Sequence, residues 1–271
     1  MIKLKTKEEI QILRIGGQKL ATIVDETASK IRPGISTAEL DEIAGKLIEL
    51  HGGKSSFLNY TPIGANRPYP ANICVSLNNE IVHGIPTEEP KILKEGDVIT
   101  IDAGFIYDGL FTDHARTFIV GRDGEKNEFH DENKILEIPK DVKKLLAKTE
   151  EALYAGIKQA KVGNKIGDIG AAIEKIGYEN GLGVIKDLTG HGVGYGVHEE
   201  PFVPNEGKKH QGELIEEGLV IAIEPMFSLG SSYIKTADDG YTYLTEDDSL
   251  SAQFEHTIAV TAEGPIILTK K

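Results

Sequence analysis

The chain opens with two segments of helical periodicity, each bounded by recognisable start or stop residues. Residues 5–31 (KTKEEIQILRIGGQKLATIVDETASKI) predict a first helix, which Arg32-Pro33-Gly34 terminates. A second helix starts directly afterwards, where Ser36 and Glu39 form a capping-box pair. Its apolar positions recur at helical spacing until the two glycines after His51 end it.

Strand-forming segments follow, and helical periodicity then returns. Residues 73–77 and 98–102 are rich in β-branched residues, as is the run after Phe111. Residues 122–141 are polar and aperiodic, which predicts an excursion at the surface. The second half begins with two further predicted helices, Val142 to Ile157 and Ile166 to Asn180.

Two segments of the second half repeat segments of the first. LKEGDVITID (93–102) matches IEEGLVIAIE (215–224) at its Glu, Gly, Val and both Ile positions, which aligns Asp102 with Glu224. A weaker match relates residues 33–53 to residues 162–182. Ordered similarity over two segments predicts a duplicated unit whose halves share a central cleft.

The repeat also bears on domain organisation. We expect one domain over residues 1–271, in the α/β (α+β) class, with pseudo-repeats of roughly 1–121 and 142–271. Asp102 and Glu224 would then lie on related strands that face the same cleft.

Asp102 is an unusual residue for a buried strand, because an unpaired charge there suffers a large desolvation penalty. Asp108-Gly109 predicts a type I′ hairpin turn, which sets Gly104 opposite Asp113 and puts the two carboxylates on one face. Two acids in close contact trap a proton or share a cation. The alternative is a solvated hairpin with Asp113 at the surface.

Composition narrows the functional classes. Hydrophobic content of 39% and charged content of 27% are typical of a soluble globular protein. The 43 acidic residues outnumber the 30 Lys and Arg, and the net charge of −13 argues against nucleic acid or an anionic membrane as main partner. The single cysteine, Cys74, excludes an intramolecular disulfide, and no apolar run suits a signal peptide or a membrane span. We therefore expect a cytoplasmic protein.

Further candidate ligands lie in the C-terminal half, in LTGHGVGYGVHEEP (188–201), VIAIEPM (220–226) and SAQFEHTIAV (251–260). Glu224 and Glu255 each stand at one end of a strand-forming run, and His191 lies between two glycines that let the backbone approach a ligand. Two aspartates, two glutamates and a histidine offer enough donors for two adjacent divalent metals with bridging carboxylates. Such a pair activates water, which indicates hydrolysis.

Two more histidines are candidates for substrate contact. His83 and His198 could bind substrate or stabilise a tetrahedral intermediate, although an isolated loop histidine is more often a surface or hydrogen-bonded residue. Competing motifs are missing, because the chain has no Gly-x-Ser-x-Gly elbow and no Walker A sequence, and HEEPF differs from the zincin motif.

Taken together, these segments resemble type I methionine aminopeptidases over nearly the whole chain. The motifs that carry the resemblance follow the family's order: NNEIVHGIP, GDVITIDAGFIYDGLFTDHARTFIVG, GHGVGYGVHEEP, IEPM and SAQFEHTI. The resemblance implies the pita-bread fold, in which helices cover an antiparallel sheet with internal two-fold symmetry. It also implies a monomeric enzyme that removes initiator methionine from the N-termini of nascent polypeptides when the second residue is small, and it leaves the ribosome open as a partner.

The resemblance assigns a role to each candidate ligand. Asp102 would bind one metal, Asp113 and Glu255 would bridge both, and His191 and Glu224 would complete the second. Co, Mn, Fe and Zn all suit such a donor set.

The resemblance also assigns the catalytic and substrate-binding residues. Glu224 would shuttle a proton to and from the bridging water, while His83 and His198 would contact the scissile amide. Residues 61–68 form an insertion relative to the family pattern. The positions matching the methionine side-chain pocket are Phe57, Tyr60, Tyr69, Cys74 and Val197.

Three other interpretations stay open at this point. X-Pro peptidases share the metal-ligand set but normally carry a large N-terminal domain, and the stretch before Asp102 is short. An inactive pita-bread binding module typically lacks some of the ligands, whereas this chain has them all. A type II enzyme would carry a long insertion between Glu224 and Glu255, and this chain has none.

Overall fold

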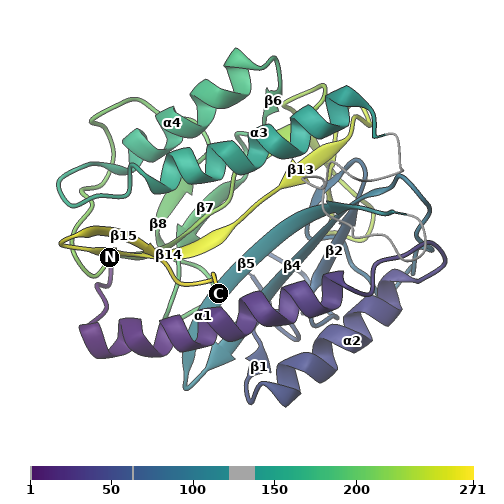
Figure 1. Cartoon of the computed structure of the whole chain (residues 1–271), viewed down its shortest axis with the longest axis horizontal. Coiled ribbons are helices and arrows are strands. Elements are labelled where there is room, and N and C mark those ends of the chain that lie inside the picture. The colour runs from purple at the N-terminus through teal and green to yellow at the C-terminus, as the bar shows by residue number, and fades with distance from the viewer. Residues whose placement is uncertain (1, 63, 122–137) are drawn as a thin grey trace.

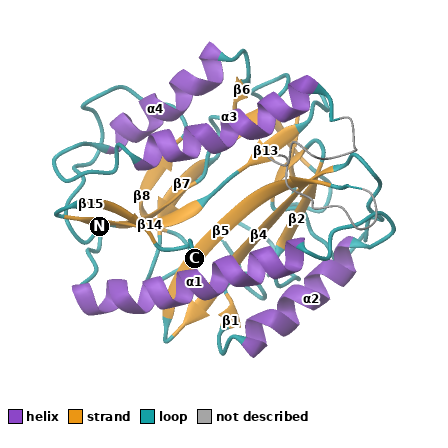
Figure 2. Cartoon of the chain, in the orientation of Figure 1, coloured by secondary structure: helices purple, strands orange, loops and turns teal. Residues whose placement is uncertain are grey.

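The structure, a computed structural model, describes residues 2–62, 64–121 and 138–271. Most of the predicted excursion over 122–141 therefore lies outside the described residues. Two pairs of helices run along the strands, one pair in each half of the molecule (Figures 1 and 2). The helices are α1 (Lys7–Ala28), α2 (Thr37–Leu50), α3 (Lys140–Ile157) and α4 (Ile166–Glu179).

The strands form two larger and two smaller antiparallel sheets. Their bounds are β1 (Lys54–Ser55), β2 (Cys74–Leu77), β3 (Glu80–Val82), β4 (Val98–Tyr107), β5 (Leu110–Ile119), β6 (Gly183–Val184), β7 (Thr189–Gly192), β8 (Glu199–Pro204), β9 (Val220–Ile223), β10 (Met226–Ser228), β11 (Ile234–Thr236), β12 (Tyr243–Thr245), β13 (Ser251–Gln253), β14 (His256–Thr261) and β15 (Gly264–Ile267).

In the first large sheet β4 pairs with β1, β2 and β5, and in the second the strand order is β15-β14-β9-β7-β8. The smaller sheets have the orders β13-β10-β6 and β11-β12-β3. All these ladders are antiparallel, which confirms the predicted antiparallel sheet covered by helices.

The helices begin where their caps place them. Thr6 and Glu9 form a capping box that starts α1 at Lys7, two residues later than the apolar pattern predicts. Ser36 and Glu39 form the predicted capping box of α2. Because each box satisfies backbone N–H groups that the first turn leaves without partners, the local sequence fixes both starts.

A large hydrophobic core lies beneath the helix pair of each half. In one, α1 and α2 pack on β2, β4 and β5 through residues such as Leu20, Leu40 and Ile101. In the other, α3 and α4 pack against the strands of the second half through residues such as Leu145 and Ile221. Each half thus buries the apolar stripes of its own helix pair.

The contacts of the two halves match one another as the repeat predicts. The Gly34 N–H donates to the Leu93 carbonyl at 2.9 Å, and at the aligned positions the Gly163 N–H donates to the Ile215 carbonyl at 3.0 Å. The aligned turns before β4 and β9 share a left-handed glycine, Gly96 (φ 89°) and Gly218 (φ 92°). The duplicated unit is therefore present in the backbone as well as in the sequence.

Strand lengths differ from the sequence pattern at the hairpin. The strand expected over 98–102 continues to Tyr107, and its partner β5 starts at Leu110. The ladder extends to the turn because Asp108 (φ 49°) and Gly109 (φ 80°) both adopt the left-handed conformation of a type I′ turn.

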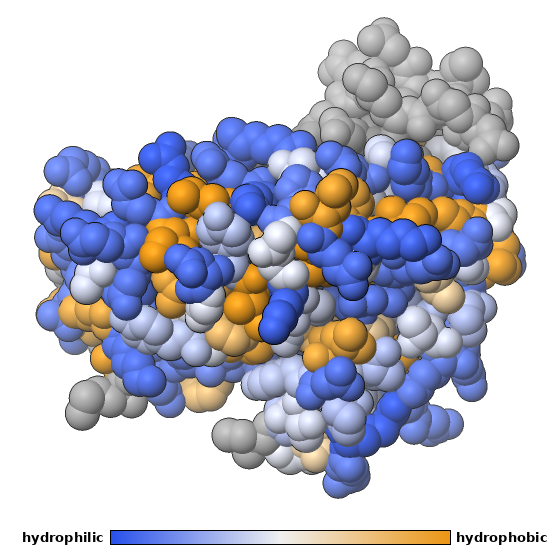
Figure 3. All heavy atoms as spheres, turned by 90° about the horizontal axis from the view of Figure 1, so that it is seen from below, coloured by the Kyte–Doolittle hydropathy of each residue, from blue (hydrophilic) through white to orange (hydrophobic). Residues whose placement is uncertain are grey.

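The outer surface carries charge between small apolar groups. Seen from below the view of Figure 1, most of the face is hydrophilic, and its apolar residues lie in scattered groups (Figure 3). No helix in the described part of the chain is long and apolar enough to cross a membrane.

Candidate metal centre and active site

The β4–β5 hairpin brings two of the predicted ligands together. Gly104 faces Asp113 and Asp102 faces Ala115 in the ladder, so the two acids are diagonal neighbours as predicted. Both side chains are buried and line the same cavity. The solvated-hairpin alternative for Asp113 is therefore wrong.

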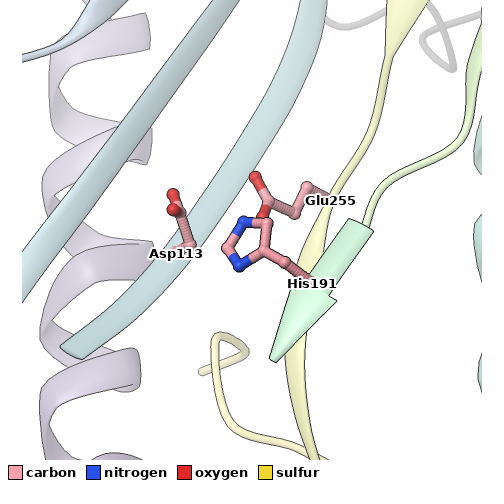
Figure 4. Close-up of side chains that lie close together, drawn as sticks. All are labelled: Asp113, His191 and Glu255. Carbon is pink, nitrogen blue, oxygen red and sulfur yellow. The ribbon is translucent and has the colours of Figure 1, made fainter. Parts of the chain in front are cut away.

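The second half supplies the other three predicted ligands, which line the same cavity. His191 lies on β7, Glu224 follows β9, and Glu255 directly precedes β14. Side-chain donor atoms of Asp113, His191 and Glu255 all lie within 4.8 Å of one another, and Figure 4 shows the three side chains converging from separate segments of the chain. Asp102 and Glu224 line the same cavity.

Burial makes this group of carboxylates electrostatically costly without a cation. In the metal-free protein, burial raises the pKa of Asp102 to about 7. Burial raises the pKa of Asp113, Glu224 and Glu255 well above the usual range, and the neighbouring carboxylates add to the effect. Asp102 Oδ1 and Glu255 Oε1 are buried without a hydrogen-bond partner. Oxygen atoms in this state fit ligands of a divalent cation.

His191 is held in the form that a metal ligand requires. Its Nδ1 lies 2.9 Å from the Gly192 carbonyl and donates to it, which leaves a lone pair on Nε2, 3.6 Å from Glu224 Oε1. Burial, reinforced by His198, lowers the pKa of His191 to about 3, so the ring is neutral. A neutral imidazole with a free Nε2 completes a donor set suited to divalent metals.

Backbone and side-chain contacts orient the carboxylates. The Thr257 hydroxyl accepts from the Asp113 N–H at 2.8 Å and donates to its carbonyl at 2.7 Å. Gln253 Nε2 donates to Glu224 Oε2 at 3.1 Å. Sequence reasoning missed Gln253, although its place two residues before Glu255 in the same motif was a usable signal.

His114 is also part of this support. Its Nδ1 lies 2.5 Å from the Glu255 carbonyl, and its ring stacks on His256 with centroids 4.8 Å apart. Each of these two histidines follows a candidate ligand in sequence. The pair therefore ties β5 to the start of β14 behind the site.

His83 and His198 also border the cavity. The hydroxyl of Tyr60 lies 3.0 Å from His198 Nδ1, and the rings of His191 and His198 meet edge to face at 4.5 Å. Burial lowers the pKa of His83 to about 4 and also lowers the pKa of His198, so both rings are neutral near pH 7.

The cavity itself has a volume of about 90 Å³. Four of the five residues predicted for the side-chain pocket line it, whereas Val197 is buried and is not among the described residues of the lining. Tyr241 and Pro62 also line it, and neither was predicted; Tyr241 packs edge-on against Tyr69 with centroids 5.2 Å apart. The lining is Phe57, Tyr60, Pro62, Tyr69, Cys74, His83, Asp102, Asp113, His191, His198, Glu224, Tyr241 and Glu255.

Comparison with known proteins agrees with this site. The model of metallopeptidase family M24 matches residues 11–262. The methionine aminopeptidase of Aquifex aeolicus (strain VF5) is 43% identical over 273 residues, which cover 99% of each chain. The chain therefore belongs to metallopeptidase family M24.

Solved structures show the same fold at two levels of similarity. The methionine aminopeptidase of Thermotoga maritima matches 100% of both chains with a TM-score of 0.89 at 35% identity. An Xaa-Pro dipeptidase from Bacillus anthracis matches 99% of this chain but 62% of its own, with a TM-score of 0.74 at 24% identity. The pita-bread fold expected from the sequence is confirmed, and the dipeptidase likeness concerns the fold alone.

Proposed function

We propose that the chain is a methionine aminopeptidase that removes initiator methionine from nascent polypeptides when the second residue is small. The observation that carries this proposal is that all five expected ligands line one cavity, which Phe57, Tyr69 and Cys74 also line. The requirement for a small second residue rests on the similarity to full-length methionine aminopeptidases.

Two divalent metal ions form the second part of the proposal. Asp102 would hold one ion, His191 and Glu224 would hold the other, and Asp113 and Glu255 would serve both. Mn, Fe, Co and Zn suit this set of oxygen and imidazole donors. When bound, the pair supplies a water whose pKa is lowered toward neutrality. The two buried carboxylate oxygens without hydrogen-bond partners support metal binding here.

The protein's own groups move and hold the protons. Gln253 holds Glu224 Oε2, so Oε1 is the oxygen that takes up a proton from the attacking water and returns it to the leaving amine. The Tyr60 hydroxyl, whose pKa burial raises, stays protonated and lies 3.0 Å from His198 Nδ1, and we propose that it donates to this nitrogen. His198 therefore carries its proton on Nε2, from which it donates to the substrate carbonyl, and neutral His83 lies beside the same amide.

The proposal extends to the setting of the enzyme. We propose that residues 1–271 form one catalytic domain that acts as a monomer in the cytoplasm on nascent chains. Size-exclusion chromatography with light scattering tests the monomer, and co-sedimentation with ribosomes tests whether the enzyme docks there.

Peptide cleavage tests the activity directly. Metal-stripped protein, with and without added Mn or Co, is incubated with Met-Ala-Ser and Ala-Pro-Ser, and the products are identified by mass spectrometry. Metal-dependent release of methionine alone is the expected result. Cleavage of only the proline peptide would move the chain to the X-Pro group, and inertness toward both with metal bound would favour a binding module.

A further inference from the structure

A second cavity of about 520 Å³ continues from the metal centre toward the surface. It shares six lining residues with the first cavity, including His83, His198 and Glu224. The buried side chains of Tyr69 and Cys74 line the first cavity but not the second, and therefore mark its end away from the second cavity. A substrate whose first side chain occupies that end must therefore lead the rest of its chain out through the second cavity, which we call the exit groove.

Two segments of the second half form part of the lining of the exit groove, together with residues of the first half such as Tyr60 and Val82. One is the loop Asp187–Leu188 with the start of β7, and the other is the first part of β8, which is an edge strand of its sheet. On β8, Glu200 and Phe202 are exposed on either side of the buried Pro201, and the Phe202 side chain is 62% exposed. The wall thus presents a carboxylate and an aromatic ring together.

The charged side chains that line the exit groove are acidic. Asp187, Glu199 and Glu200 line the groove, and its lining contains no Lys or Arg within the described ranges. Lys5 forms an ion pair with Glu199, in which Nζ lies 2.7 Å from Oε2. The two side chains are 1% and 12% exposed. Within the residues that the structure describes, neither Asp187 nor Glu200 forms an ion pair, and Lys186, next to Asp187, pairs with Glu174 and Glu206 instead. Two carboxylates therefore remain without a cation beside the path of the substrate.

We infer that the exit groove binds the substrate beyond its second residue and prefers a lysine or arginine there. A long basic side chain can lay its methylene groups or guanidinium on Phe202 while its charge faces Glu200 and Asp187. An acidic side chain at the same place would meet two like charges. This inference rests on the proposed aminopeptidase function and adds a preference for the residues that follow the small second one.

Peptides that differ at one position test the inference. Amidated Met-Ala-Xaa-Gly and Met-Ala-Gly-Xaa are compared, with Xaa as Lys, Gln or Glu, together with Met-Ala-Gly-Gly. At low salt we expect kcat/KM to be about three- to tenfold higher for Lys than for Glu at one of these positions, through KM rather than kcat. At about 0.5 M salt the difference should shrink, because exposed charges are screened.

Substitutions assign the preference to the groove. The double variant Asp187→Asn/Glu200→Gln should lose the distinction between Lys and Glu peptides, measured as the ratio of their kcat/KM values. A matched double variant of exposed acids elsewhere, Glu49→Gln/Glu216→Gln, should keep it. Equal kcat/KM for Lys and Glu peptides in the wild type, or an unchanged preference in the groove variant, would overturn the inference. Failure to cleave even Met-Ala-Gly-Gly would instead contradict the proposed function.

Discussion

At the scale of single residues, the site contains buried acidic side chains whose ionised forms are destabilised by desolvation. Asp102 and Glu255 each bury an oxygen without a hydrogen-bond partner, and Asp113 lies between them with a pKa raised by burial and by Asp102. Such groups are tolerated when a bound cation or a proton neutralises them. The stability of the metal-free protein should therefore depend on pH through these residues.

The sign of that dependence follows from the raised pKa of Asp102. Its stabilising contribution is fully present below its usual value of 3.8 and is lost as pH rises through about 7, because the folded state holds the proton more tightly than the unfolded state. In the presence of a chelator, Asp102→Asn should thus gain stability over the wild type between pH 5 and 8, by about 2–4 kcal/mol at the upper end. Urea unfolding at each pH measures this; a gain independent of pH would contradict it.

At the scale of elements, Gly104 of the β4–β5 hairpin lies beside Phe57, which lines the substrate cavity. A Cβ added there would overlap the Ser56 hydroxyl and lie 2.8 Å from Phe57 Cε1, and Phe57 lines the cavity. Gly109, in the turn of the same hairpin, has open space around it and a φ of 80°. Substitutions at the two positions therefore distinguish side-chain crowding, at Gly104, from strain in a left-handed backbone, at Gly109.

We expect Gly104→Ala to lower stability by about 1–3 kcal/mol and to raise KM for Met-Ala-Ser, because Phe57 must move. Gly109→Ala should cost about 1 kcal/mol through its left-handed backbone and leave KM unchanged. Thermal unfolding and steady-state kinetics on both variants provide the comparison. Equal effects on KM would show that crowding at Gly104 does not reach the cavity.

At the scale of the whole molecule, the candidate metal ligands come from both halves of the chain. Asp102 and Asp113 come from the first, whereas His191, Glu224 and Glu255 come from the second. Each half has its own hydrophobic core, so a shared cation adds a link that neither half has alone.

Metal should therefore stabilise the whole chain. At a free concentration of about 100 Kd, Mn or Co should add about 2.7 kcal/mol, which corresponds to a rise in Tm of roughly 5–10 °C. Asp102→Ala and Glu224→Ala should lose most of this shift together with activity, while Glu216→Gln, an exposed acid outside the site, should keep both. Differential scanning calorimetry with and without metal measures this rise in Tm. Full metal binding and activity in both alanine variants would rule out the assigned ligands.

Much of this protein was determined locally by the sequence. The capping pair of Ser36 and Glu39 sets the start of α2, and Asp108-Gly109 fixes a turn whose register places Asp102 diagonally to Asp113. These predictions succeed because they depend on backbone conformation and on the alternation of side chains over a few residues. The repeat added the equivalence of Asp102 and Glu224 for the same reason.

Only the tertiary structure decided which distant residues meet. Tyr241 reaches the cavity by packing on Tyr69, and Gln253 bonds Glu224 across the pairing of separate strands. Asp187 and Glu200 likewise face one groove although they belong to different segments. Periodicity and turn signals describe neighbours along the chain, whereas these contacts depend on how the two halves close on each other. The sequence thus predicted the candidate ligands, and the closing of the halves determined the walls around them.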